Sequence, residues 1–83
     1  MLLIALSIFD EKAAFYSPPF YCKTVNEGAR SFSDALHSQG SALSAHPEDY
    51  SLYTIGSFDD NSGCFTPHSV PNFVMRGSAV DIV

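Results

Sequence analysis

The sequence predicts one small α+β domain, in which an antiparallel sheet of about four strands carries a single amphipathic helix. Three observations predict it: an apolar run opens the chain, a capped helical pattern follows, and a turn then interrupts an aromatic-rich stretch. A length of 83 residues leaves room for one domain only. We expect residues 1–68 to form this domain and residues 69–83 to be an irregular C-terminal tail.

Short strands are predicted before the helix. Leu2–Phe9 is apolar at odd and even positions alike, which is typical of a strand covered on both faces. A polar turn at residues 10–12 leads into the extended stretch Ala13–Tyr16, so these segments are predicted to form a hairpin. Ser17-Pro18-Pro19 then interrupts the pattern, because proline has no N–H group to donate to a sheet. We expect an edge, a bulge or a crossover there, before Phe20–Lys23 becomes extended again.

The helix is predicted over Thr24–Ser38. It opens with a capping-box pattern, in which the Thr24 hydroxyl accepts from the Glu27 amide and the Glu27 carboxylate reaches back to Thr24. Arg30 and Asp34 lie four residues apart on the polar side, where an ion pair would add roughly a few tenths of a kcal/mol. The apolar side, which we expect to pack on the sheet, consists of Val25, Ala29, Phe32 and Leu36.

A second hairpin is predicted after the helix. His46–Asp49 forms a turn around Pro47, and Tyr50–Phe58 has the aromatic and β-branched content of a strand. Gly56 within this strand indicates a bulge or a close backbone approach. The turn residues 59–63 end in a glycine, and residues 64–66 are expected to pair back as the second arm.

The composition favours self-association and argues against a simple nucleic-acid binder. Hydrophobic residues make up 46% of the chain and aromatic residues 13%, whereas only 16% are charged, which excludes a disordered chain. One core of this size cannot bury so much apolar surface, so we expect a homo-oligomer, either a dimer or a larger assembly. The net charge is −5, and phosphate contacts need clustered lysines and arginines, which the sequence does not contain.

The cysteines and the first residues bear on the compartment. Cys22 and Cys64 are far apart and form no CxxC pair, so a reducing compartment is favoured, with a single bridge between them as the alternative. The opening residues MLLIALSIF lack the basic start of a signal peptide. No apolar run approaches the roughly 20 residues of a membrane span, so we expect no membrane partner.

No pattern in the sequence predicts catalysis, a cofactor or a metal. His46, Glu48 and Asp49 could form a weak metal site, but surface residues of a turn are the better interpretation. Residues 59–63 lack the acid spacing of a calcium loop, so a hairpin turn is favoured. No nucleophile lies in a GxSxG-type motif, and a chain this short has little room for a deep pocket. We expect a protein that is not an enzyme; a small hydrolase is the remaining alternative.

Aromatic and basic residues supply the candidate nucleic-acid contacts. Aromatic side chains on a sheet can stack unpaired bases, each contributing about 1–3 kcal/mol, but without a basic groove core packing and a dimer interface are the favoured interpretation. A basic patch would form if Lys12, Lys23 and Arg30 met in space, and the helix N-terminus would add backbone amides that favour phosphate. The candidate nucleic-acid-binding residues are Lys12, Lys23, Arg30, Tyr16 and Tyr21.

Four separate stretches carry a resemblance to a known family. They are Ile8–Ala13 with Pro18-Pro19-Phe20, Gly28–Asp34, His46–Tyr53, and Ile55–Asp60 with Gly63. In their order and spacing, over roughly residues 3–65, these stretches resemble the small non-structural protein of gokushoviruses, which are single-stranded DNA phages of the Microviridae.

The resemblance implies a phage protein that is made in the host bacterial cytoplasm and is absent from the mature virion. Family members are often labelled DNA-binding and are thought to aid the switch from duplex replication to single-strand synthesis and packaging. The implied partners are single-stranded DNA or replication proteins of the phage or its host. The alternative function is a self-associating interaction module with no direct nucleic-acid contact.

Overall fold

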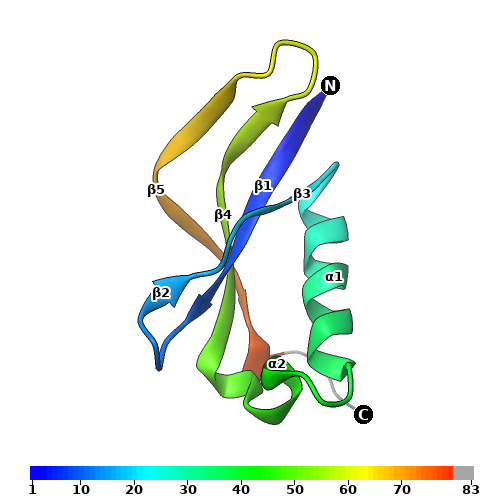
Figure 1. The fold of residues 1–83 in the computed structure, drawn as a ribbon, viewed down its shortest axis with the longest axis vertical. Coiled ribbons are helices and arrows are strands. Elements are labelled where there is room, and N and C mark those ends of the chain that lie inside the picture. Colours follow the sequence, from blue (N-terminus) through cyan, green and yellow to red (C-terminus); the bar gives the residue numbers. More distant parts are fainter. Residues whose placement is uncertain (80–83) are drawn as a thin grey trace.

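Antiparallel strands form one curled sheet, and helix α1 packs along one of its faces (Figure 1). The computed structural model describes residues 1–79. The strands pair in the order β2-β1-β4-β5, and β3 pairs with the same edge of β1 as β2 does. The α+β class predicted from the sequence is therefore confirmed. The elements are β1 (Leu2–Asp10), β2 (Phe15–Tyr16), β3 (Phe20–Cys22), α1 (Val25–His37), β4 (Tyr50–Asp59) and β5 (Phe65–Arg76).

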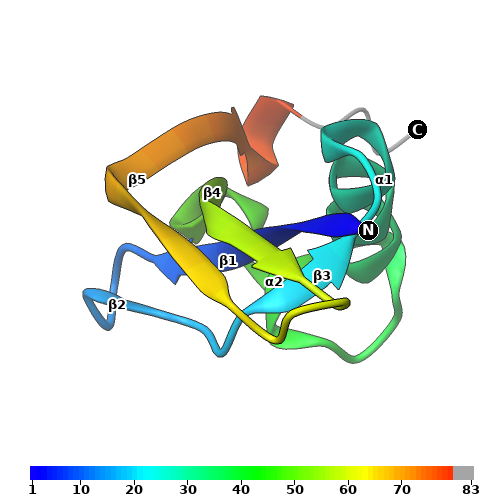
Figure 2. The ribbon, with the colours of Figure 1, turned by 90° about the horizontal axis from the view of Figure 1, so that it is seen from above.

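Three short helical segments gather at one end of the sheet. They are α2 (Ala42–Ala45) and the 3-10 turns Pro47–Asp49 and Gly77–Ala79. Seen from above, α1 runs along one side of β1, while β5 curves away on the other side (Figure 2). Within residues 1–79, no helix is long and apolar enough to cross a membrane.

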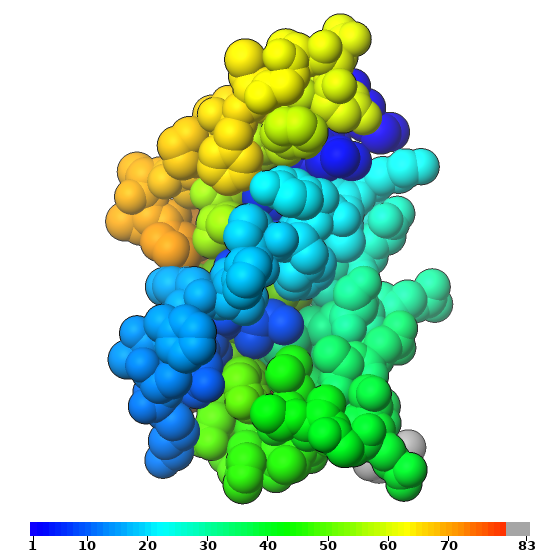
Figure 3. Space-filling model, viewed as in Figure 1, coloured from blue at the N-terminus to red at the C-terminus, as the bar shows by residue number. Residues whose placement is uncertain are grey.

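The hairpin predicted at the start of the chain forms, and the proline segment interrupts its edge. Asp10 pairs with Phe15, and Leu6 pairs with Phe20, so the chain returns to β1 after the break. Between them, the Ser17 hydroxyl accepts from the Ile8 amide at 2.9 Å and replaces a backbone acceptor in the ladder. In the space-filling view, residues of β2 and β3 lie across the middle of the visible side, between β5 and α1 (Figure 3).

Helix α1 begins and ends where the sequence predicts, with two local differences. The Thr24 hydroxyl accepts from the Glu27 amide at 3.1 Å, but the Glu27 carboxylate accepts from the Lys23 amide, not from Thr24. The predicted ion pair between Arg30 and Asp34 is absent from those in the described part of the chain. Both side chains are exposed and keep their water, which offsets the small gain of an exposed pair.

The core lies between α1 and the α1-facing side of the sheet. Leu6 and Leu52 of the central strands are fully buried against Phe32 and Leu36 of the helix, as the apolar stripe predicts. Val25, also assigned to that stripe, is 37% exposed because it occupies the first turn, at the edge of the contact. In its place Gly28 faces the sheet, where a Cβ would lie 2.5 Å from the Leu6 Cδ2 atom.

The expectation of an irregular tail is wrong for residues 69–76, which form the second half of β5. Pro67 and Pro71 fit within β5 because it is an edge strand, where a missing N–H is tolerated. Residues 77–79 are a 3-10 turn, and residues 80–83 lie outside the described part of the chain.

Gly56 marks both a bulge and a close approach, as predicted. On β1, Ala5 pairs with Gly56 and the next residue, Leu6, pairs with Thr54, so Ile55 is an extra residue in β4. A Cβ at Gly56 would lie 2.5 Å from the Thr66 carbonyl oxygen of β5. The predicted turn at residues 59–63 is also confirmed, with Gly63 at a φ of 77°.

Candidate functional site

The sheet face opposite α1 carries most of the exposed aromatic rings, and we call it the open face. Even-numbered residues of β1 from Ile4 to Ile8 contact the core under the helix, so the odd-numbered residues lie on the other side. Within residues 1–79, no α-helix covers that other side. Its aromatic residues, placed by strand register, are Phe9, Tyr16, Tyr21, Tyr53, Phe58, Phe65 and Phe73.

Four of these rings form a continuous cluster across four strands. The Tyr53 centroid lies 5.7 Å from that of Phe73, 5.6 Å from that of Tyr16 and 6.2 Å from that of Phe9, each with an edge-on orientation. The Phe9 and Tyr16 centroids are 4.7 Å apart. Tyr53 and Phe9 are half-buried, whereas Tyr16 is 41% and Phe73 57% exposed. The inner two rings therefore support two outer rings that are available to a ligand.

A second, smaller group of rings lies further along the same face. The Tyr21 and Phe58 centroids are 5.7 Å apart. Phe65 pairs with Phe58 across the β4–β5 hairpin, and its ring reaches over the bare backbone of Gly56. A side chain at Gly56 would displace this ring, so the glycine also shapes the open face.

The bulge at Ile55 decides which rings share this face. Tyr53 and Phe58 are five positions apart, and in a regular strand an odd spacing would put them on opposite faces. The extra residue restores the alternation, so Tyr53 pairs with Ser7 and Phe58 pairs with Leu3, both on the open side of β1.

Both aromatic residues among the sequence candidates lie on the open face, but the list was incomplete. Tyr16 and Tyr21 are there, together with Phe9 and Phe73, which the sequence reasoning missed. The alternation of side chains along the first strand could have placed Phe9 on this face, because Phe9 is at an odd-numbered position. Phe73 lies in the stretch assigned to the tail and had no such signal.

The basic candidates do not form one patch. Cys22, next to Lys23, pairs with Ile4, whereas Lys12 lies beyond Asp10 at the other end of β1. The six intervening steps of β1 separate the two lysines by about 20 Å. Arg30 is exposed along the helix.

The N-terminus of α1 is capped by Thr24 and carries an acidic side chain. The Thr24 hydroxyl accepts from the Glu27 amide in the first turn, and the Glu27 carboxylate accepts from the Lys23 amide just before the helix. The Glu27 carboxylate there opposes a phosphate, so the open face is the better candidate for a nucleic-acid contact.

One basic side chain missed by the sequence reasoning lies at the rim of the open face. Arg76 pairs with Ser51, which in turn pairs with Phe9, so it occupies the same side of the sheet as the ring cluster. Its guanidinium lies 2.9 Å from the Glu11 carboxylate, and both side chains are exposed.

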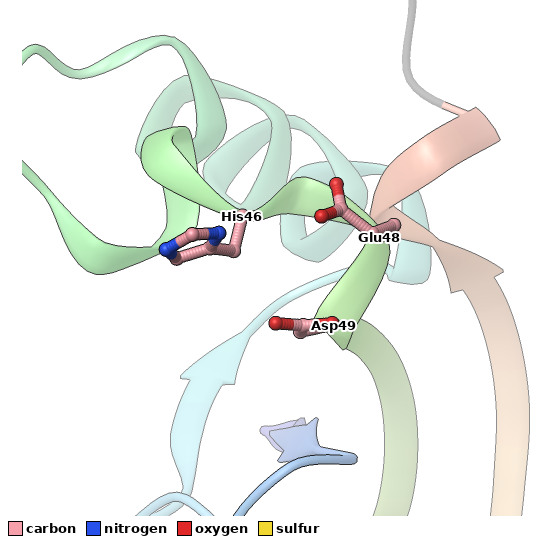
Figure 4. Close-up of side chains that lie close together, drawn as sticks. All are labelled: His46, Glu48 and Asp49. Atoms are coloured by element: carbon pink, nitrogen blue, oxygen red, sulfur yellow. The ribbon is translucent and has the colours of Figure 1, made fainter.

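A separate group of side chains meets at the turn before β4. Donor atoms of His46, Glu48 and Asp49 all lie within 4.8 Å of one another. The two carboxylates point toward the side of the turn where the imidazole lies (Figure 4). These are ligand types for a divalent cation. Cys22 and Cys64, by contrast, are both free thiols, so the bridge considered from the sequence is not formed.

Comparison with known proteins identifies the family. No curated protein and no solved structure shows significant similarity to the chain. A family model described as Phage ORF5 protein, however, matches residues 3–80. Because the match covers nearly the whole chain, the protein belongs to the Phage ORF5 protein family and is a phage accessory protein.

Proposed function

We propose that this phage protein is an accessory factor of genome replication that binds single-stranded DNA on its open face. The observation that carries the proposal is the ring cluster, in which Tyr16 and Phe73 are exposed and Tyr53 holds them in place. A bound strand would assist the switch to single-strand synthesis or packaging in the host cytoplasm, alone or together with replication proteins.

Stacking is the interaction that this surface supports best. An unpaired base gains about 1–3 kcal/mol by stacking on an aromatic side chain, whichever base it is. A base in a duplex already stacks on its neighbours, and its faces are not accessible. The open face therefore favours single-stranded over duplex DNA and should discriminate little between base sequences.

Charge limits the electrostatic contribution. The chain carries a net charge of −5, and its basic residues are dispersed. Each phosphate contact contributes a slope of about −0.7 to the salt dependence of single-strand affinity. Among residues 1–79, register places one basic side chain, Arg76, at the ring cluster, so the slope should be shallow and correspond to one or two contacts.

A titration of labelled oligo-dT at low salt, followed by fluorescence anisotropy, tests the proposal. Phe73→Ala should weaken binding by about tenfold or more, because one stacking ring is lost. Phe15→Ala is a matched control: Phe15 has the same 57% exposure but pairs with Asp10 and faces the α1 side. No binding at low salt, or an equal loss in both variants, would refute the proposal.

Self-association through the open face is the second candidate function. It is favoured because the aromatic rings form a contiguous apolar surface with the charged Arg76 only at its rim, while the negatively charged chain as a whole repels polyanions. Light scattering over a range of concentrations should then show a dimer or larger species, which Phe73→Asp disrupts by burying a charge. A strict monomer at high concentration would count against self-association and leave single-stranded DNA binding as the proposed function.

A further inference from the structure

The turn between α2 and β4 brings together a nitrogen donor and two carboxylates. His46 and Glu48 are exposed and Asp49 is half-buried, and their donor atoms lie within 4.8 Å of one another. In the described part of the chain, none of these side chains takes part in an ion pair or a hydrogen bond. All three groups are therefore free to bind a ligand.

We propose that His46, Glu48 and Asp49 form a binding site for a divalent transition-metal ion, with Zn²⁺ as the representative ion. One imidazole nitrogen and two carboxylate oxygens are a donor set that such ions accept, with the remaining positions filled by water. The function proposed for the open face does not require this site, and the two stand independently.

The distances are compatible with closure around an ion. Bonds of about 2.0–2.2 Å to zinc place neighbouring donor atoms about 3–3.5 Å apart. Donor atoms that begin within 4.8 Å need to approach by roughly 1–2 Å. Rotation of the exposed His46 and Glu48 side chains supplies this movement without any change in the backbone.

The backbone beneath the three side chains is held from several directions. The Asp49 amide donates to the His46 carbonyl at 3.0 Å, and the Glu11 amide donates to the Asp49 carbonyl at 2.9 Å. Gly77 packs so tightly on the Pro47 carbonyl that any side chain at Gly77 would collide with it. The donor groups are therefore presented by a rigid turn, so binding requires only side chains to be ordered.

Negative charge at this corner adds attraction for a cation. Glu48 and Asp49 place two carboxylates beside the imidazole of His46. The guanidinium of Arg76 is paired with Glu11. No ion pair in the described residues neutralises Glu48, Asp49 or Asp10.

Zinc chloride titrated into the chain by isothermal calorimetry tests the site. One ion should bind per chain, and His46→Ala should weaken it by at least about tenfold, the range seen when metal sites lose a supporting group. His68→Ala is the matched control, because His68 is also an exposed histidine and lies on β5, away from the turn. In proton NMR, zinc should shift the ring resonances of His46 before those of His37 or His68.

Two further measurements separate a built site from simple acidic attraction. Glu48→Gln and Asp49→Asn should each weaken zinc binding while the circular dichroism spectrum stays unchanged. Magnesium should bind far more weakly than zinc, since it does not use the imidazole. The proposal is wrong if zinc does not saturate a single site, if His68→Ala costs as much as His46→Ala, or if magnesium binds equally well.

Discussion

The Arg76 guanidinium at the end of β5 lies 2.9 Å from the Glu11 carboxylate in the β1–β2 turn. The pair joins two segments that are 65 positions apart in the sequence. Both side chains are about half exposed, so the pair contributes at most about 1 kcal/mol to stability. Its larger effect is to neutralise the guanidinium at the rim of the ring cluster.

Removing Glu11 should therefore strengthen DNA binding if the proposed function is right. In Glu11→Gln the guanidinium is released to a phosphate, so oligo-dT affinity should rise and the salt slope should steepen by about 0.7. Arg76→Ala should have the opposite effect on both quantities. Anisotropy titrations at several salt concentrations measure them, and Asp34→Asn, which removes an acid from the exposed side of α1, controls for net charge. An equal gain from Asp34→Asn would contradict a specific role for the pair.

Alanine at Gly28 should destabilise the fold, although alanine is the better helix former. The new Cβ would lie 2.5 Å from Leu6 Cδ2 in a fully buried contact, so overpacking should cost about 1–3 kcal/mol, more than the roughly 0.5–1 kcal/mol gained in helix propensity. Urea unfolding measures the difference. In a Leu6→Ala background the same change should be neutral or stabilising. If the penalty persists there, the contact with Leu6 is not its cause.

The hydrogen bond from the Ile8 amide to the Ser17 hydroxyl is expected to contribute more to the free energy of unfolding than an ordinary surface hydrogen bond does. Ser17→Ala leaves the Ile8 amide without its acceptor in the middle of β1, which should lower the free energy of unfolding by about 1–3 kcal/mol. Ser69→Ala, on the exposed part of β5, should change it by less than about 0.5 kcal/mol. Similar urea midpoints for the two variants would show that water replaces the hydroxyl at Ile8.

Stability should decline at both acid and alkaline pH through the β4–β5 turn. The Asn61 amide donates to Asp59 at 2.9 Å and lowers the pKa of that carboxyl below 3.8, so its contribution is present above that pH and lost as the pH falls through the lowered pKa. The hydrogen bond to Asp60 raises the pKa of the Met1 amino group above 8.0, so its contribution is present below pH 8.0 and lost as the pH rises through the raised value.

Urea midpoints measured from acid to alkaline pH in the 83-residue chain would show both declines. Asp59→Asn should flatten the acid decline, and Asp60→Asn should flatten the alkaline one. Unchanged profiles in these variants would assign the pH dependence to other groups.

The parts of the fold that could be predicted are those fixed by local chemistry. Thr24 and the stripe at Phe32 and Leu36 define α1, because capping and helical spacing are both visible in the chain. The second half of β5 could not be predicted in this way. Its prolines suit an edge strand, and whether a strand is an edge depends on the assembled sheet.

The candidate site was only partly predictable for the same reason. Tyr16 and Tyr21 are recognisable as strand aromatics, but their grouping with Tyr53 and Phe73 depends on register. Lys12 and Lys23 are far apart because Lys12 follows the C-terminal end of β1, whereas Cys22, next to Lys23, pairs near its N-terminal end. The spacing of the two lysines in the sequence does not reveal this pairing.

The extra residue in β4 makes the open face sensitive to the length of one strand. Deleting Ile55 would rejoin Thr54 directly to Gly56 and invert the side-chain alternation of one half of the strand relative to the other. Either Tyr53 or Phe58 would then turn toward α1, into space that Leu52 and Leu6 already fill. Relatives that keep the aromatic face should therefore lengthen or shorten β4 between these tyrosine and phenylalanine positions by two residues at a time. A change of a single residue would turn one half-buried ring of the open face toward the core.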